Sequence, residues 1–276
     1  MKVGILAGGL GTRISEETVD KPKPMVEIGT QPIMWHIMKH YYHYDFKNFV
    51  VALGYKGHVI KKYFRDYCAF NSNLTVELRN GKITNHSDDT VDDWTVELID
   101  TGLSTNTGGR IKRLIPYLSN AKKGQAYGKE TFLLTWGDGV SNIDLKQLLA
   151  FHNYHKEESG ILATLTAVRP PARFGHLEFS GERIAKFSEK PQTAEGWING
   201  AFFVLEPEVF EYIDGDETLF EKEPLEGLAA DGKLMAYKHE GFWQCMDTLR
   251  DKKRLVKMWE TGNAPWKTWT DKFQLL

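Results

Sequence analysis

Cysteine is nearly absent from this sequence, and its scarcity excludes a disulfide-stabilised fold. Among 276 residues there are only two cysteines, Cys68 and Cys245, which lie far apart along the chain. They form no Cys-x-x-Cys pair and are too few for a disulfide framework. Two reduced thiols are typical of a cytoplasmic protein.

A basic excess and long apolar runs are also missing. The 35 lysines and arginines are interspersed with 37 aspartates and glutamates, which gives a net charge of −2. Proteins that wrap nucleic acid usually show a basic excess or stripe, so no nucleic-acid partner is expected. No stretch approaches the roughly 18 apolar residues of a membrane helix, and the first residues lack the apolar core of a signal peptide. We therefore expect a cytoplasmic protein with no membrane partner.

Short apolar runs alternate with amphipathic stretches through the first 70 residues. Residues 3–7 and 49–53 are apolar runs followed by glycine, which is typical of buried parallel strands. Residues 32–44, opened by a proline, and 58–67 have the pattern of amphipathic helices. This alternation predicts parallel βαβ units in an α/β fold. Further strands are expected at 74–78, 95–99, 131–136, 162–168 and 201–205, a hairpin at 176–187, and helices at 108–118, 144–156, 224–230 and 249–260.

Three polar features have ordinary structural interpretations. The aspartates at 88, 89, 92 and 93 lie between two expected strands and are interpreted as a solvated loop. His152 and His155 have no metal-binding spacing, so we assign them a structural or solvated role. The absence of repeats and linkers predicts a single domain spanning residues 1–276.

The first expected strand leads directly into a glycine-rich loop, from Leu6 through Ala7, Gly8, Gly9, Gly11 and Thr12 to Arg13. In an open α/β sheet, loops at the carboxyl ends of strands bind ligands. Glycines allow backbone N–H groups to approach phosphate closely, and an arginine supplies a fork-shaped cation for its oxygens. The spacing matches neither a Walker A loop nor a dinucleotide-binding loop, because Ile14 stands where the latter needs its last glycine.

The loop resembles the Gly-Gly-x-Gly-Thr-Arg signature of sugar nucleotidyltransferases, and Lys21-Pro-Lys23-Pro-Met25 resembles the Pro-Lys-Pro element of that family. The resemblance implies a Rossmann-like three-layer sandwich with a mostly parallel mixed sheet, of the nucleotide-diphospho-sugar transferase type. It also implies that the loop and Gly137 bind nucleotide, and that Arg13 and Lys23 are catalytic. Two prolines restrict the backbone around Lys23, which pre-organises its ammonium group.

Two aspartates are candidate Mg²⁺ ligands. Asp138, between two glycines, ends an expected strand at the sheet edge that carries the glycine loop, where a carboxylate can hold Mg²⁺ or form an Asx turn. Asp247 alone fits the N-cap of the last helix. The resemblance favours metal binding at both positions, since the family has a Gly-Asp metal ligand and a second one in a Trp-x-x-x-Asp-Thr segment.

The sugar-phosphate side rests on the resemblance as well. Glu189 and Lys190 match a Glu-Lys-Pro element of the family, and Asn199 and Gly200 match a sugar-contacting Asn-Gly pair. The implied sugar-binding elements occupy about 170–245, followed by a C-terminal helical segment at about 248–276.

Further stretches, including residues 26–29, 35–39, 107–110 and 264–269, resemble the subfamily that transfers the cytidylyl group of CTP to glucose 1-phosphate. In that subfamily, residues matching Thr105 and Arg110 bind nucleotide, and the enzyme is a homo-oligomer. Trp266 and Trp269 fit either a core or such an interface. From the residues alone, use of UTP or dTTP and a non-catalytic sugar-nucleotide binding protein stay open as alternatives.

The expected reaction is an in-line attack of the sugar phosphate on the α-phosphorus of CTP, with Mg²⁺ as cofactor. A phosphate monoester has a second pKa near 6, so the nucleophile is mostly ionised at neutral pH and needs no general base. The motifs accordingly supply cations and carboxylates, with no Ser-His-Asp arrangement. Their expected work is to neutralise and align two anions.

Overall fold

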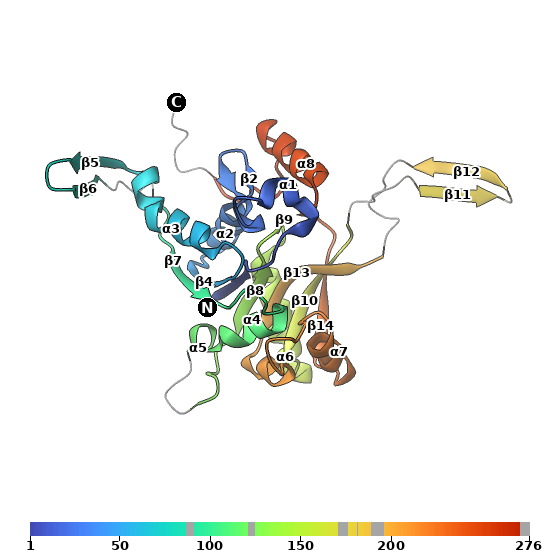
Figure 1. Cartoon of the computed structure of the whole chain (residues 1–276). Coiled ribbons are helices and arrows are strands. Elements are labelled where there is room, and N and C mark those ends of the chain that lie inside the picture. The colour runs from blue at the N-terminus through green and yellow to red at the C-terminus, as the bar shows by residue number, and fades with distance from the viewer. Residues whose placement is uncertain (87–90, 121–124, 171–175, 181, 189–195, 271–276) are drawn as a thin grey trace.

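The computed structural model describes residues 1–86, 91–120, 125–170, 176–180, 182–188 and 196–270. Within them, seven strands form the central sheet in the order β14-β10-β13-β8-β1-β4-β7 (Figure 1). Strand β13 is antiparallel to both of its neighbours, whereas the other pairings are parallel. This mostly parallel mixed sheet confirms the predicted fold class. The strands are β1 (Val3–Leu6), β4 (Asn48–Leu53), β7 (Thr95–Asp100), β8 (Phe132–Trp136), β10 (Ala163–Val168), β13 (Ile198–Leu205) and β14 (Leu234–His239).

Alternating side chains of the central strands enter two hydrophobic cores, one on each face of the sheet. Val3 and Ile5 lie in the first core and Leu6 in the second, because successive side chains of a strand point to opposite faces. The first core is covered by α2 (Ile33–His43), α3 (Gly57–Asn71), α6 (Leu145–Ser159) and α8 (Leu249–Glu260). The second is covered by α4 (Thr107–Arg113), α5 (Ile115–Leu118), the 3₁₀ helix η3 (Pro207–Tyr212) and α7 (Glu223–Ala230).

Shorter elements connect and extend these layers. They are the 3₁₀ helices η1 (Thr12–Ile14) and η2 (Lys23–Met25), α1 (Ser15–Thr18), and the antiparallel pairs β2–β3 (Glu27–Ile28, Gln31–Pro32), β5–β6 (Asn73–Glu77, Lys82–His86), β9–β15 (Gly139–Ser141, Trp243–Cys245) and β11–β12 (His176–Ser180, Arg183–Ser188). Among the residues described here, no helix is long and apolar enough to cross a membrane.

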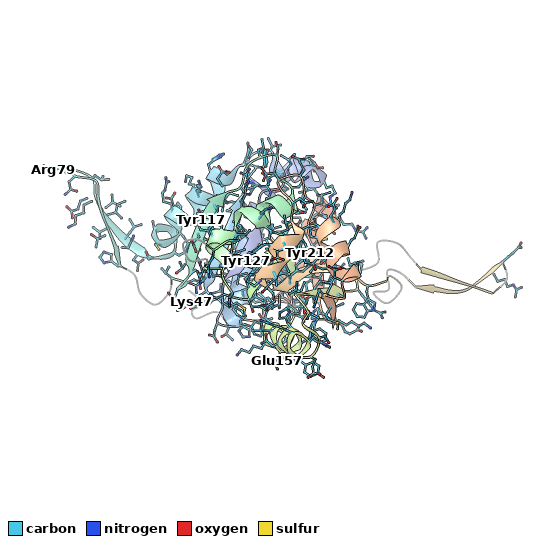
Figure 2. All side chains as sticks on the ribbon, turned by 90° about the horizontal axis from the view of Figure 1, so that it is seen from below. Lys47, Arg79, Tyr117, Tyr127, Glu157 and Tyr212 are labelled. Atoms are coloured by element: carbon cyan, nitrogen blue, oxygen red, sulfur yellow. The ribbon has the colours of Figure 1, made fainter. Side chains whose placement is uncertain are left out.

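Two local expectations from the sequence were wrong, and one hairpin was missed beyond the strand predicted at 74–78. The helix expected at 108–118 is divided into α4 and α5, because Pro116 has no N–H to continue the hydrogen-bond ladder. Pro32 precedes α2 as its N-cap instead of opening the first turn. Finally, β5 is followed by β6 to form a hairpin, and Figure 2 shows Arg79 at its far tip, away from the body of the molecule.

The aspartates interpreted as a solvated loop are in part buried. Asp88 and Asp89 lie outside the described residues. The Asp92 side chain is only 11% exposed and binds the ammonium of Lys39 at 2.7 Å, while its second oxygen accepts a hydrogen bond from the Tyr67 hydroxyl at 2.8 Å. A carboxylate at this depth requires such partners, so the solvated interpretation is wrong for Asp92.

The aromatic and histidine expectations have clear outcomes. Trp266 is fully buried and Trp269 is 7% exposed, so both belong to the core on the α2 and α8 face. His152 is also buried, between Thr164 of β10 and Glu206, which follows β13, and this confirms its structural role.

Candidate active site

A cavity of about 310 Å³ opens at the carboxyl ends of β1 and β8. This is the edge of a parallel sheet at which ligands bind in open α/β folds. The cavity brings together most of the residues that the sequence predicts to bind nucleotide or metal. Its lining comprises Leu6, Ala7, Gly8, Gly9, Gly11, Thr12, Arg13, Ile14, Lys23, Pro24, Thr105, Asn106, Thr107, Arg110, Trp136, Gly137, Asp138 and Leu219.

The glycine loop needs glycine at specific positions. A Cβ atom at Gly8 would lie 2.2 Å from Nη1 of Arg110, whereas one at Gly9 would meet nothing within 4 Å. Gly11 has a φ angle of 66°, which favours glycine because other residues are strained there. The loop thus packs against Arg110 at Gly8 and leaves open space at Gly9.

Arg110 is a buried cation at one end of the cavity. It is 5% exposed and donates hydrogen bonds to uncharged oxygens, including Oγ1 of Thr101 at 2.8 Å and the carbonyl of Gly102 at 2.7 Å. Burial, followed by the nearby charge of Arg113, lowers the pKa of the guanidinium below its ordinary value. An anionic or carbonyl-bearing ligand at this end would therefore meet a positive group held in place by the backbone.

A compact ionic cluster adjoins the cavity on the side of the first core, where Met25 of η2 packs, whereas Trp136 packs against the second core. Nζ of Lys23 lies 2.7 Å from Oδ2 of Asp138 and 2.5 Å from Oδ1 of Asp247, and Nη1 of Arg13 lies 2.7 Å from Oδ2 of Asp247. Lys23 and Asp247 are only 9% and 8% exposed. Two carboxylates and two cations from three distant parts of the chain thus meet at one point.

The ionisation of this cluster follows from its contacts. Burial on its own lowers the pKa of Lys23, but the Asp138 and Asp247 carboxylates outweigh burial and raise it. Burial likewise favours the neutral form of Asp247, and hydrogen bonding and charge from Lys23 and then Arg13 outweigh it, so its pKa is lowered. Lys23 and Asp247 are consequently both charged at neutral pH.

Short secondary elements bring the two aspartates together. Asp138 directly precedes β9, which pairs with β15, and the N–H of Met246 donates to the Asp138 carbonyl at 2.8 Å. The N-cap of α8 is Thr248, whose hydroxyl accepts from the N–H of Asp251 in a capping box. The alternative prediction that Asp247 caps this helix is therefore wrong, and its carboxylate is turned toward Lys23.

The donor set fits a magnesium ion. In the described part of the chain, no group of three or more His, Cys, Asp and Glu side chains comes together as a metal site. Asp138 and Asp247 are joined through a single ammonium group. Two carboxylates, with substrate phosphates and water as remaining ligands, are what Mg²⁺ commonly uses.

The residues predicted to bind the sugar are placed less completely. Glu189 and Lys190 lie outside the described residues. Asn199 and Gly200 are on β13 and do not line the cavity: Oδ1 of Asn199 accepts from the N–H of Ala201 at 2.8 Å, and the Gly200 carbonyl accepts from the indole of Trp243 at 2.8 Å.

The structure adds cavity residues that the sequence interpretation missed. Trp136 and Leu219 supply apolar surface, and Thr107 and Asn106 supply polar groups at the start of α4. Trp136 ends an apolar strand one residue before Gly137, so its position in the sequence could have predicted that it lies in the cavity wall. Leu219 lies in an irregular segment, and nothing in its local sequence places it near the glycine loop.

Comparison with known proteins extends this description. Residues 2–263 match the model of the family described as nucleotidyl transferase. The chain belongs to this nucleotidyl transferase family. This nucleotidyltransferase is 51% identical to the glucose-1-phosphate cytidylyltransferase of Salmonella typhimurium, over 98% of this chain and 100% of that protein. It is 43% identical to a probable glucose-1-phosphate cytidylyltransferase of Bacillus subtilis, again over 98% and 100%.

Solved structures share the fold of this nucleotidyltransferase. HddC from Yersinia pseudotuberculosis superposes with a TM-score of 0.63 at 21% identity, over 94% of this chain and 99% of that one. A UDP-glucose pyrophosphorylase complexed with UDP-glucose gives a TM-score of 0.62 at 15% identity, over 95% and 98%. At these identities the likeness concerns the fold alone, and it agrees with the predicted three-layer architecture.

Proposed function

We propose that this nucleotidyltransferase transfers the cytidylyl group of CTP to α-D-glucose 1-phosphate and releases pyrophosphate. The observation that carries the proposal is the 51% identity to glucose-1-phosphate cytidylyltransferase across essentially both chains. The cavity supports it independently, because one end gathers cations and carboxylates suited to a triphosphate. The other end offers Trp136 and Leu219 as apolar surface for a nucleoside.

The proposed chemistry uses charge instead of a general base. The phosphate of glucose 1-phosphate is mostly ionised at neutral pH and attacks the α-phosphorus in line with the departing pyrophosphate. Arg13 and Lys23 offset the negative charge that both substrates bring together. Asp138 and Asp247 would hold Mg²⁺, which supplies Lewis-acid stabilisation of the phosphate oxygens when bound.

The present contacts of Lys23 fit this role. Its ammonium is held by the two carboxylates that would bind the metal, next to the backbone N–H groups of the glycine loop. If a metal ion were the counter-charge of those carboxylates, the Lys23 ammonium would be free to contact the phosphates. Glu189, Lys190, Asn199 and Gly200 stay the predicted sugar-phosphate contacts, and the homo-oligomer and the cytoplasmic location stay predictions.

The test is pyrophosphate release by the purified protein with Mg²⁺ and glucose 1-phosphate, offering CTP, UTP, dTTP, ATP and GTP separately. We expect release with CTP, and a loss of about 10²- to 10³-fold in kcat for Lys23→Ala, as for other preorganised charges. Lys21→Ala is the matched control, since Lys21 pairs with Glu27 and does not line the cavity.

The outcomes separate the alternatives. Release with UTP or dTTP in place of CTP would preserve the reaction and overturn the choice of base. Release with none of the nucleotides, together with tight binding of CDP-glucose, would favour a sugar-nucleotide binding protein.

A further inference from the structure

We propose that Trp136 is a specificity-determining residue, which favours a pyrimidine over a purine by closing the nucleoside end of the cavity, and that Glu221 positions its ring. The proposal rests on the proposed nucleotidyl transfer and names the feature that limits the size of the base. It concerns residues for which the sequence analysis predicted no role.

The position of Trp136 follows from the two sides of the cavity: η2, which carries Lys23, packs on the first core, and Trp136 packs on the second core with α4. The cations and carboxylates around Lys23 and Asp138 fit the triphosphate. In the proposed binding mode, the nucleoside of the same molecule extends toward Arg110, Leu219 and Trp136, which also line the cavity. Trp136 is the last residue of β8, in register with Leu6 at the start of the glycine loop. Its indole is thus the largest side chain in this part of the wall.

The ring is fixed by aromatic packing from behind. Its centroid lies 5.0 Å from that of Phe203, with 29° between the planes, and 6.3 Å from that of Phe220. Phe203 and Phe220 are themselves fully buried and pack edge to face at 5.7 Å. Because a close-packed interior resists displacement, the indole cannot retreat into the core when a larger base enters.

A chain of hydrogen bonds fixes the edge of the same ring. The indole N–H of Trp136 donates to Oε1 of Glu221 at 3.0 Å, and Oε2 of Glu221 accepts from the Thr107 hydroxyl at 2.5 Å. That hydroxyl in turn accepts from the N–H of Phe220 at 2.9 Å. The chain ties β8 to the first residue of α4 and to the segment before α7. Rotation of the indole would break its bond to Glu221.

The fold itself does not determine base size. A mannose-1-phosphate guanylyltransferase subunit of Dictyostelium discoideum, whose name specifies a purine nucleotide, is 28% identical over 91% of this chain. A local feature must therefore set the limit. A purine exceeds a pyrimidine by a fused five-membered ring, and an indole fixed in the wall limits the space for that extra ring. Cytosine and uracil are nearly equal in size, so this wall cannot distinguish them.

The experiment measures kcat/KM for CTP, UTP, GTP and ATP in the wild type, Trp136→Leu and Glu221→Ala, with calorimetric binding of CTP and GTP in parallel. We expect Trp136→Leu to raise the GTP-to-CTP ratio at least about tenfold, within the range that single-group steric discrimination reaches. The CTP-to-UTP ratio should be unchanged. Glu221→Ala should shift the purine ratio in the same direction by a smaller factor.

Two further variants separate positioning from mere structural damage. Glu221→Gln keeps an acceptor oxygen for the indole N–H and should retain the wild-type selectivity. Glu223→Ala, at an exposed position two residues away, is the matched control and should also retain it. A general loss of stability would lower kcat with every nucleotide and leave the ratios unmoved.

Unchanged purine-to-pyrimidine ratios in both Trp136→Leu and Glu221→Ala would overturn the proposal, as would equal use of GTP and CTP by the wild type. If Trp136→Leu does not fold, the purine-to-pyrimidine ratio of Glu221→Ala decides whether the proposal holds. If the wild type releases no pyrophosphate, the proposed reaction is refuted independently of the role of Trp136. The ratio of GTP to CTP affinity in the variants then still tests whether Trp136 limits the size of the base.

Discussion

Glu206 is expected to control the acid stability of this protein. It follows β13 at the sheet edge opposite the cavity and is 4% exposed. Its Oε1 is 2.7 Å from the Thr131 hydroxyl and 3.0 Å from Nε2 of His152, and Oε2 is 2.8 Å from Nζ of Lys156. A buried carboxylate with three partners favours the ionised form.

The magnitude follows from the pKa of Glu206. Burial alone would raise this pKa, but hydrogen bonds from His152, Lys156 and Thr131 outweigh it and lower the value from 4.5 to about 2. Since one pKa unit is worth about 1.36 kcal/mol, ionised Glu206 contributes roughly 3 kcal/mol to the free energy of unfolding. With a pKa lower in the folded state, the contribution is complete above about pH 5.5 and is lost as the pH falls from about 4.5 to about 2.

The assay is urea denaturation of the wild type and Glu206→Gln between pH 7 and pH 2.5. We expect the wild type to exceed the variant by about 3 kcal/mol near pH 7 and the difference to shrink steadily below pH 4.5. Glu208→Gln, at an exposed position two residues later, is the control and should follow the wild type. A difference that stays constant down to pH 2.5 would refute the reasoning.

Three further changes test the site and its support. Gly8→Ala places a Cβ 2.2 Å from the Arg110 guanidinium and should weaken CTP binding at least about tenfold in calorimetry, since the arginine must move. Asp92→Ala leaves the largely buried ammonium of Lys39 without its carboxylate and should lower the free energy of unfolding by about 3 kcal/mol. Asp93→Ala, in an exposed pair with Lys47, should cause little change, and urea denaturation measures both variants. Lys23→Met removes the cation between two carboxylates and should tighten Mn²⁺ binding without nucleotide at least about tenfold, as measured by electron paramagnetic resonance; unchanged or weaker binding would contradict this competition.

The central sheet could be predicted because its signal is local. Residues 3–7 and 49–53 are apolar throughout, since both faces of a parallel strand are covered, and they became β1 and β4. The last helix was predicted at its observed bounds, Leu249–Glu260, from its amphipathic pattern. In these segments, local preference and tertiary burial favour the same structure.

Short pairings were missed because they carry no periodic signal. Strands β9 and β15 have three residues each, too few for an alternating pattern, and yet they hold Asp138 and Asp247 together. The β5–β6 hairpin, in contrast, does carry a local signal in the sequence, and it was overlooked. Asn80-Gly81 is a strong turn signal, and Gly81 has the positive φ angle of 70° that such a turn uses.

The reversed strand β13 connects the separate parts of the site. Because it runs opposite to β8, it begins at the sheet edge where the cavity opens. There its Gly200 carbonyl binds Trp243 on β15, the strand that leads to Asp247, and three residues later Phe203 supports the ring of Trp136. A substitution that shifts β13 along its register should therefore disturb the nucleoside wall and the second carboxylate together.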